Sequence, residues 1–402
     1  MIFKQKTTYS VFFILFVWLS VMKLDAQSGI WVGSWSCAPY AAGSRNTPPP
    51  PYLAHNTLRQ VVRVSIGGDT LRLRFSNKTC SSPVTMNSVN IAVSKGGSAI
   101  DASTVRTLKF HGDTAVTMDP YSSVTSDPLS FPLSPSMRLA ITIHYGEAGS
   151  TEDMTSHVAS RTDSYIVPGD QVSSADFKDP VITAHWFHIQ TIDVLAPDHA
   201  ACVGIIGNSI TDGYGLSGGL QNRWPDVLSQ ELLDNESTQH VGVLNLGIGA
   251  TTLSGTDPTS GVSRFHDDIL KQSGLRWVIV FYGTNDIGAG KSSATIIDAF
   301  RELIDASRAR NIKVYGATIT PFKGSGYYSQ AHEAVRKEVN EWIRTPGNFD
   351  ACIDFDLCIR DPLDPEKMLE QYSKDWLHPN VDGYEFLGKS VDPDLFSDMK
   401  TH

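Results

Sequence analysis

The second half of the chain alternates between two residue patterns, and this alternation most constrains the fold. Continuous apolar runs, typical of strands buried on both faces, alternate with segments whose apolar residues recur at helical spacing. The predicted strands are 201–206, 241–246, 277–282, 313–319 and 351–355, and the predicted helices are about 222–233, 264–270, 294–308, 329–343 and 382–391. Strands and helices that alternate in this way form a parallel sheet. The sequence therefore predicts an α/β domain with a five-stranded parallel sheet over residues 197–402.

Residues 27–196 follow a different pattern, in which short alternating runs are separated by clusters of Gly, Ser, Asp and Pro. Runs at 58–65 and 71–75 flank Gly67-Gly68-Asp69, which predicts a hairpin with one face in solvent. Further strands are predicted at 89–93, 139–144 and 187–194. Because no helical period intervenes, we expect an N-terminal β-sandwich or jelly-roll-like domain.

The first 26 residues are typical of a secretory signal peptide. Lys4 and Lys6 precede an apolar stretch over 11–22, and the small residue Ala26 ends the segment. The stretch is short for a membrane span, although an uncleaved anchor is the alternative. We therefore expect a secreted or periplasmic protein without a membrane span in its mature part.

Charge and cysteine content narrow the possible partners. The chain has 43 acidic and 33 basic residues and no long basic run, so nucleic-acid binding is not expected. Cys37 with Cys80 and Cys352 with Cys358 are candidate disulfides, and Cys202 is predicted to be a buried thiol. The sequence has no CxxC or HExxH pattern, so we expect neither a metal ion nor a cofactor. The oligomeric state is left open by the sequence.

Four short segments carry the polar residues of a hydrolase. They are Gly207-Asn208-Ser209-Ile210, Asn245-Leu246-Gly247-Ile248-Gly249, Gly283-Thr284-Asn285-Asp286 and Asp375-Trp376-Leu377-His378. Each alone is compatible with an ordinary turn, a helix cap or a loop histidine. The first three follow predicted strands, and parallel sheets bind ligands at the carboxyl ends of their strands. We therefore expect the four segments to form one site.

Ser209, His378 and Asp375 have the chemistry of a catalytic triad. A serine hydroxyl becomes a good nucleophile when a neighbouring base removes its proton. His378 is the predicted base, because imidazole exchanges protons near neutral pH. Asp375, three residues earlier, is predicted to orient the ring and to stabilise its charged form.

An acyl transfer also needs donors for the oxygen that becomes anionic. The backbone N–H groups of Ser209 and Gly249 and the side-chain amide of Asn285 are predicted to form this oxyanion hole. A side chain at position 249 would crowd the substrate carbonyl, which explains a glycine there. Gly247 is the alternative donor in the same segment.

These segments resemble the blocks of the GDSL or SGNH hydrolase superfamily, whose name lists its Ser, Gly, Asn and His. The resemblance runs from about residue 201 to 387 and matches Ser209, Gly249, Asn285, Asp375 and His378 to the family's functional positions. It implies a flavodoxin-like three-layer fold and esterase chemistry without a metal. A preceding all-β domain is similar to a secreted subgroup associated with polysaccharide-degrading systems.

Asn208 departs from the family pattern, because the name-giving motif has Asp at this position. Since the predicted triad carboxylate is Asp375, the chemistry should survive this change. Any structural bond that the motif's Asp makes must then be made differently.

The sequence leads to one preferred function and two alternatives. We expect an exported carboxylic ester hydrolase that removes small acyl groups, preferably acetyl, from polysaccharides. The first alternative is a lipase, thioesterase or aryl esterase that acts on hydrophobic acyl esters. The second is a carbohydrate-binding protein whose hydrolase domain is weakly active because of Asn208.

Several further polar residues have two possible roles. Arg223 and Trp224 either contact substrate or only begin a helix, and Asp212 is predicted to organise the turn after Ser209. Asp354 and Asp356 end the predicted fifth strand, but no second acid is paired with them as a glycosidase requires. Four residues of the β domain are candidates to reach the active site from across the interface: His157, Tyr165, His185 and Trp186.

Overall fold

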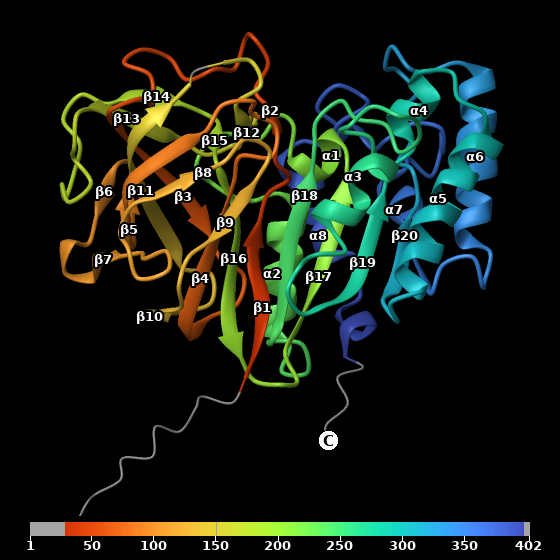
Figure 1. The fold of residues 1–402 in the computed structure, drawn as a ribbon. Helices are drawn as coiled ribbons and strands as arrows, with labels where there is room; N and C mark the ends of the chain where they lie inside the picture. The colour runs from red at the N-terminus through yellow and green to blue at the C-terminus, as the bar shows by residue number, and fades with distance from the viewer. Residues whose placement is uncertain (1–28, 150, 398–402) are drawn as a thin grey trace, which may run out of the picture.

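The computed structural model describes residues 29–149 and 151–397 (Figure 1). The signal peptide predicted over residues 1–26 lies outside these residues. The described chain begins with sheets of β-strands and continues into alternating strands and helices, and the two parts lie side by side (Figure 1). No helix among the described residues is long and apolar enough to cross a membrane.

The second part contains the predicted five-stranded parallel sheet. Its strands are β17 (Ala201–Gly207), β18 (Val241–Gly247), β19 (Leu275–Phe281), β20 (Lys313–Ala317) and β21 (Ala351–Ile353). Their order is β18-β17-β19-β20-β21, and every pairing is parallel. This is the order of flavodoxin-like folds, in which the chain winds in opposite directions from the first strand. The prediction of an α/β domain is therefore confirmed.

Helices cover both faces of this sheet. They are α1 (Ser209–Asp212), α2 (Trp224–Asp234), α3 (Gly261–Asp268), α4 (Thr284–Gly288), α5 (Ser293–Arg308), α6 (Gln330–Arg344), α7 (Phe355–Ile359) and α8 (Val381–Lys389), with short 3-10 turns η2 (Glu370–Tyr372) and η3 (Pro393–Phe396). Apolar side chains of α2, α7 and α8 pack in one cluster with Val203 and Ile279. Those of α3, α5 and α6 pack in another with Ile206 and Val280. Because alternate strand residues point to opposite faces, the result is three layers.

The fifth strand is shorter than predicted. It ends at Ile353, and Asp354 caps helix α7 by accepting a hydrogen bond from the Leu357 N–H. Asp356 lies inside α7, where it is buried and pairs with Arg336 at 2.6 Å. The two acids therefore do not end the strand as predicted, and both are structural.

The first part of the chain is built from antiparallel strands. They are β1 (Ile30–Ser36), β2 (Tyr40–Ala41), β3 (Asn56–Arg63), β4 (Gly68–Ser76), β5 (Val84–Gly96), β6 (Ala99–Ile100), β7 (Arg106–Thr107), β8 (Val116–Met118), β9 (Ser123–Thr125), β10 (Leu129–Leu133), β11 (Arg138–Ala148), β12 (Thr155–His157), β13 (Ser164–Pro168), β14 (Val181–Thr183), β15 (Trp186–Phe187) and β16 (Ile189–Ala196), with one 3-10 turn η1 (Ala102–Thr104). One sheet has the order β1-β16-β4-β10 with β9 beside β4. Another has the order β14-β13-β3-β11-β5-β6 with β7 and β8 beside β5, and a small sheet has the order β15-β12-β2. Apolar side chains of both larger sheets share one buried cluster.

The predicted hairpin between the runs at 58–65 and 71–75 is wrong. Strand β3 pairs with β11 and β13, whereas β4 pairs with β16, β10 and β9, so the two strands belong to different sheets. A Cβ on Gly67 would lie 2.2 Å from the Leu133 carbonyl oxygen. The glycine is therefore needed for close approach to another strand rather than for a hairpin turn. The predicted solvent face of β3 is also wrong, since even Arg59 is fully buried.

Strand β1 packs beside β18, the edge strand of the parallel sheet (Figure 1). A Cβ on Gly242 would lie 2.1 Å from the Gly33 carbonyl oxygen. The Ser65 hydroxyl also accepts a hydrogen bond from the Val243 N–H at 3.0 Å. These close contacts hold the β-strands of the first part against the α/β part.

All five cysteines are free thiols, so neither candidate disulfide is formed. Cys37, Cys80 and Cys202 are buried, and Cys202 lies in β17 as the sequence predicted. Burial raises the pKa of the Cys202 thiol well above its ordinary value, which disfavours the reactive thiolate.

Candidate active site

Ser209 lies at the turn where β17 passes into α1. Asn208 is the N-cap of α1, and its side-chain oxygen accepts a hydrogen bond from the Ile210 N–H at 3.0 Å. An amide oxygen accepts this hydrogen bond as a carboxylate oxygen would, so the cap does not require Asp at position 208. A Cβ on Gly207 would lie 2.1 Å from Thr211 Oγ1 and 2.9 Å from the Phe281 carbonyl oxygen, so only glycine fits before this turn.

The structure brings Ser209, His378 and Asp375 together. The Ser209 hydroxyl and His378 Nε2 are 2.9 Å apart, within hydrogen-bond distance. On the other side of the ring, His378 Nδ1 lies 3.0 Å from Asp375 Oδ2. The Asp375 carboxylate also accepts the His378 backbone N–H at 2.7 Å. One carboxylate therefore fixes both the backbone and the ring of the histidine, with Nε2 facing the serine.

The charges around His378 favour a neutral base and an ionised acid. Burial lowers the pKa of His378, and the Asp375 carboxylate opposes this shift. Burial alone would raise the pKa of Asp375, but hydrogen bonds from the His378 backbone and ring outweigh it and lower the pKa. At neutral pH the histidine can therefore accept a proton while the carboxylate remains charged.

Gly249 and Gly247 differ in the state of their backbone N–H groups. The Gly247 N–H donates to Asn245 Oδ1 at 3.0 Å, and a Cβ on Gly247 would lie 2.5 Å from the Asp212 nitrogen. Within the described residues, the Gly249 N–H has no hydrogen-bond acceptor. A Cβ on Gly249 would meet only Asp212 Oδ2, at 3.7 Å. The geometry thus favours Gly249 as the donor that is free for a ligand.

Asn285 lies in the first turn of helix α4, shortly after the end of β19. Gly283 is the N-cap of this helix and has a φ of 112°. The Asn285 Nδ2 donates one hydrogen bond to the Thr251 carbonyl at 2.8 Å. Since an amide nitrogen has two N–H groups, the second is left for a ligand. Tyr327 donates a long hydrogen bond of 3.4 Å to Asn285 Oδ1, which supports the same amide orientation.

Asp286 connects the loop after Gly249 to helix α4, a role that the sequence did not predict. Its carboxylate is fully buried and accepts the Leu253 N–H at 2.8 Å, the Ser254 N–H at 2.9 Å and the Ser254 hydroxyl at 2.7 Å. These bonds tie the loop after Gly249 to the helix of Asn285. The position of Asp286 directly after Asn285 was the sequence signal available for this role.

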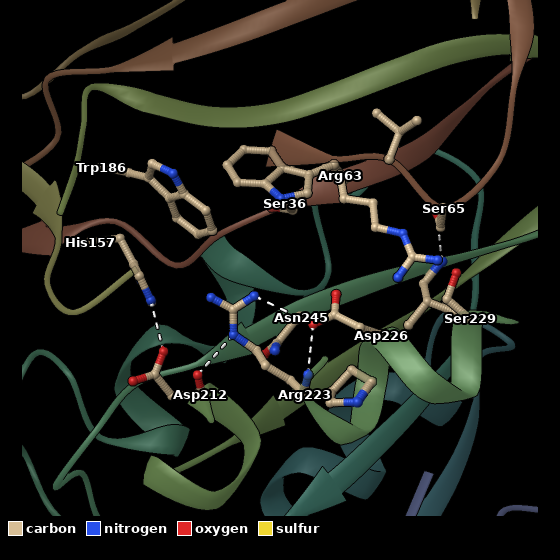
Figure 2. Close-up of a pocket in the computed structure, with 14 residues that line it drawn as sticks. Ser36, Arg63, Ser65, His157, Trp186, Asp212, Arg223, Asp226, Ser229 and Asn245 are labelled. Carbon is tan, nitrogen blue, oxygen red and sulfur yellow. Dashed lines mark hydrogen bonds and ion pairs between the residues drawn. The ribbon is translucent and has the colours of Figure 1, made fainter. Parts of the chain in front are cut away.

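Of the four candidate residues of the β-strand part, His157 contacts the Ser209 turn and Trp186 packs beside His157. His157 Nε2 lies 3.0 Å from Asp212 Oδ1, at the end of α1 (Figure 2). Trp186 packs beside the His157 ring, with centroids 5.7 Å apart. His185 instead binds the Ala159 N–H through Nδ1 at 3.0 Å, and Tyr165 packs in a separate cluster with Val61 and Phe177.

Arg223 and Trp224 begin helix α2 and are both buried. The Arg223 Nε–H donates to the Asp212 carbonyl at 2.9 Å (Figure 2). The Arg223 Nη2 donates to the Ser160 carbonyl. The Trp224 ring packs against Phe355 with centroids 5.2 Å apart. The structure therefore supports the helix-start role of these two residues rather than contact with substrate.

Behind this turn lies an interior cavity of about 30 Å³ (Figure 2). Arg63, His157, Asp212, Asp226 and Asn245 are among the residues that line it. Burial raises the pKa of Asp226, and the neighbouring Arg223 opposes the shift. A space of this size has room for on the order of one water molecule and is too small to be a substrate pocket. Among the residues that the structure describes, no group of His, Cys, Asp or Glu side chains is arranged to hold a metal ion.

Part of this chain matches a known protein family. Residues 205–386 match the family model of the GDSL-like Lipase/Acylhydrolase family. The comparison with curated proteins gives no match.

Solved structures similar to this chain align with slightly under half of it. A GDSL-like lipase from Bacteroides thetaiotaomicron is 18% identical, with 47% of this chain and 84% of that chain covered and a TM-score of 0.35. A member of the lipolytic protein G-D-S-L family from Veillonella parvula is 18% identical, with 48% and 96% covered and a TM-score of 0.36. A carbohydrate acetylesterase family member from Sinorhizobium meliloti is 14% identical, with 48% and 97% covered and a TM-score of 0.38.

Proposed function

Because residues 205–386 form a GDSL-like lipase/acylhydrolase domain, we propose that this protein is an exported serine esterase that removes acetyl groups from polysaccharides. The observation that carries the proposal is the continuous chain of contacts from Ser209 Oγ to His378 Nε2 at 2.9 Å and from His378 Nδ1 to Asp375 at 3.0 Å. This is the arrangement that activates a serine hydroxyl.

In the first half of the reaction, Ser209 Oγ attacks the ester carbonyl carbon and its proton passes to His378 Nε2. The carbonyl oxygen becomes an oxyanion, for which the Ser209 N–H, the Gly249 N–H and the second Asn285 N–H are the available donors. When the tetrahedral intermediate collapses, the sugar oxygen leaves and takes the proton from His378. The acetyl group remains bound to Ser209.

In the second half, water repeats the attack on the acyl-enzyme. His378 accepts a proton from the water molecule, and the hydroxide oxygen bonds to the acyl carbon. The intermediate collapses with release of acetic acid, and His378 returns the proton to Ser209. Asp375 keeps the ring in one tautomer throughout and stabilises its charged form.

A partly exposed aromatic side chain beside His378 supports a sugar as the alcohol part of the ester. Tyr214 is 42% exposed, and its ring lies 4.2 Å from the His378 ring, measured between centroids. An aromatic face offers dispersion contacts and apolar burial to the C–H face of a pyranose. Export of the chain, which the sequence of residues 1–26 predicts, would bring the enzyme to polysaccharides outside the cytoplasm.

A second candidate function is hydrolysis of aryl or longer acyl esters, and one pocket favours it. This pocket has a volume of about 310 Å³ and lies between the two parts of the chain. Tyr40, Ile248 and Pro258 form apolar walls, and Ile248 directly precedes Gly249. A hydrophobic acyl group that fills such a space would gain about 25 cal/mol per Å² of buried apolar surface.

The test of the proposal is a comparison of wild type, Ser209→Ala and a control variant at an exposed serine, Ser130→Ala. Release of p-nitrophenol from p-nitrophenyl acetate should be lost in Ser209→Ala and unchanged in Ser130→Ala. Equal rates in all three proteins would refute the esterase mechanism.

Substrate specificity is tested separately with a chain-length series of nitrophenyl esters and with acetylated xylan, pectin and mannan. Preference for acetyl esters and release of acetate from a polysaccharide would support the proposal. Preference for acyl chains of eight carbons or more would favour the second candidate. Glycan binding by an inactive protein would favour a carbohydrate-binding role instead.

A further inference from the structure

His157 and Arg161 of the β-strand part both bind the carboxylate of Asp212. His157 Nε2 lies 3.0 Å from Asp212 Oδ1, and Arg161 Nη2 lies 3.2 Å from Asp212 Oδ2. The side chains of His157 and Asp212 are each 4% exposed. These two partners compensate the negative charge of the buried Asp212 carboxylate.

Both ring nitrogens of His157 face oxygen atoms that can only accept a hydrogen bond. Nε2 faces the Asp212 carboxylate, and Nδ1 lies 2.9 Å from the Ala38 carbonyl oxygen. A neutral imidazole has one N–H and can donate to only one of them. The hydrogen bonds therefore assign two N–H groups, and hence a positive charge, to His157.

Asp212 is joined to the proposed catalytic atoms in three ways. It ends the helix that Ser209 begins, and its N–H donates to the Asn208 carbonyl at 2.9 Å. Its Oδ2 is the atom that a Cβ on Gly249 would meet, at 3.7 Å. The Asp212 carboxylate therefore lies beside both the nucleophile turn and the proposed oxyanion donor.

Arg161 also lies near Tyr214, which is beside the proposed base His378. Its guanidinium carbon lies 5.7 Å from the centroid of the Tyr214 ring. The Tyr214 ring also lies 4.2 Å from the His378 ring, measured between centroids. The segment that contains His157 and Arg161 thus borders the site from the nucleophile turn to the base.

We propose that His157 is a positioning residue of the hydrolytic site, which in its doubly protonated form holds Asp212 and thereby the Ser209 turn and Gly249. This inference rests on the proposed function and deepens it. The site then needs two histidines in opposite states, with His378 neutral as a base and His157 charged as a clamp. Loss of the His157 proton breaks one of its two hydrogen bonds and loosens Asp212.

The groups that face His157 come from several elements. Asp212 lies on α1, the Tyr40 ring of β2 lies 5.8 Å away and the Trp186 ring of β15 lies 5.7 Å away, both between centroids. Arg161 binds the same Asp212 carboxylate as His157 does. The guanidinium carbon of Arg223 lies 5.5 Å from the centroid of the Trp186 ring. Burial lowers the pKa of His185, and the nearby His157 lowers it further.

The experiment measures kcat and KM for p-nitrophenyl acetate against pH in wild type, His157→Gln and Asp212→Asn. Wild-type kcat should rise with pH as His378 loses its proton. His157→Gln should lower kcat by roughly 10- to 100-fold through misplacement of the Ser209 turn, with little change in KM. Asp212→Asn should also lower kcat, because an amide has one oxygen and cannot accept hydrogen bonds from both His157 and Arg161 as the two carboxylate oxygens do.

His188→Gln is the matched control, because His188 is also buried in the β-strand part but binds the Tyr145 hydroxyl at 3.0 Å and not Asp212. It should keep the wild-type profile. A wild-type kcat in folded His157→Gln would overturn the inference, while an inactive wild type would instead refute the proposed function.

A direct measurement covers the case in which His157→Gln does not fold. In ¹⁵N-histidine-labelled wild type at neutral pH, the His157 ring should show two protonated nitrogens, and in Asp212→Asn it should show one. A neutral His157 ring in the wild type would overturn the inference whatever the variants do.

Discussion

Removal of the Asn285 side-chain amide should slow the chemical step far more than it weakens substrate binding. The second N–H of this amide is the proposed donor to the oxyanion, which exists only after Ser209 has attacked. Loss of one such donor typically costs about 2.7–4 kcal/mol of transition-state stabilisation. Asn285→Ala should therefore lower kcat by about 10²- to 10³-fold with little change in KM.

The same variant should lose only a small part of its folding stability. Asn285 makes one short hydrogen bond, from Nδ2 to the Thr251 carbonyl at 2.8 Å, and such a bond contributes about 1 kcal/mol. The three hydrogen bonds from the loop after Gly249 to the Asp286 carboxylate are separate from it. Thermal unfolding followed by circular dichroism should thus show a folded protein with a modestly lower Tm.

The assay is steady-state hydrolysis of p-nitrophenyl acetate, with Tyr327→Phe as the control. Tyr327 contacts Asn285 only through a long 3.4 Å bond to Oδ1, so its loss should change kcat by less than about threefold. A loss smaller than tenfold in folded Asn285→Ala would refute the role of this amide. A KM effect that accounts for the whole loss would do the same.

Three further predictions concern the base, its pH dependence and the strand end. Asp375→Asn should lower kcat by about 10⁴-fold in the ester assay, because the ring loses the partner that fixes its tautomer, and a loss below tenfold would indicate another orienting group. Since burial lowers the pKa of His378 below its ordinary 6.5 and only the neutral ring accepts a proton, kcat/KM should rise with pH to a half-maximum below 6.5; a half-maximum above 6.5 would contradict this sign. Gly207→Ala should lower Tm and activity, because the new Cβ would lie 2.9 Å from the Phe281 carbonyl oxygen. Gly326→Ala is the control and should leave both unchanged, because a Cβ there would meet no atom within 4 Å. Equal Tm values for the two variants would contradict the packing argument.

The α/β part was predictable because local patterns and topology point to the same arrangement. The apolar runs of β17, β18 and β19 are long enough to identify buried strands, and parallel pairing brings their carboxyl ends to one edge. Ser209 and Asn285 follow such ends directly, so their approach could be expected. The contact between Asp375 and His378 could also be expected, because the two residues are only three positions apart in the chain.

The β-strand part was less predictable, because alternation shows that a strand exists but not which strand pairs with it. The Gly67-Gly68 pair looked like a hairpin turn, yet Gly67 provides room for the Leu133 carbonyl oxygen, 66 positions later in the chain. No local pattern contains that contact. The candidate disulfides failed for the same reason, since sequence spacing does not place two thiols together.

The junction of the two parts shows the same limit within the site. His157 could be named as a candidate, but its bond to Asp212 joins residues 55 positions apart. Arg161, which binds the other oxygen of the same carboxylate, was not predicted. Asp212 was expected to organise its turn, and the structure adds that two side chains of the preceding part hold it in place.

The central claim, that Ser209 is a nucleophile activated by His378, is tested most directly by covalent labelling. The protein is treated with a fluorophosphonate, digested and analysed by mass spectrometry, with His378→Ala as the comparison. The account predicts that the wild type carries one phosphonyl group on Ser209, that its esterase activity falls in step with labelling, and that His378→Ala is not labelled at the same rate. Unlabelled Ser209 in a protein that still hydrolyses p-nitrophenyl acetate would contradict it.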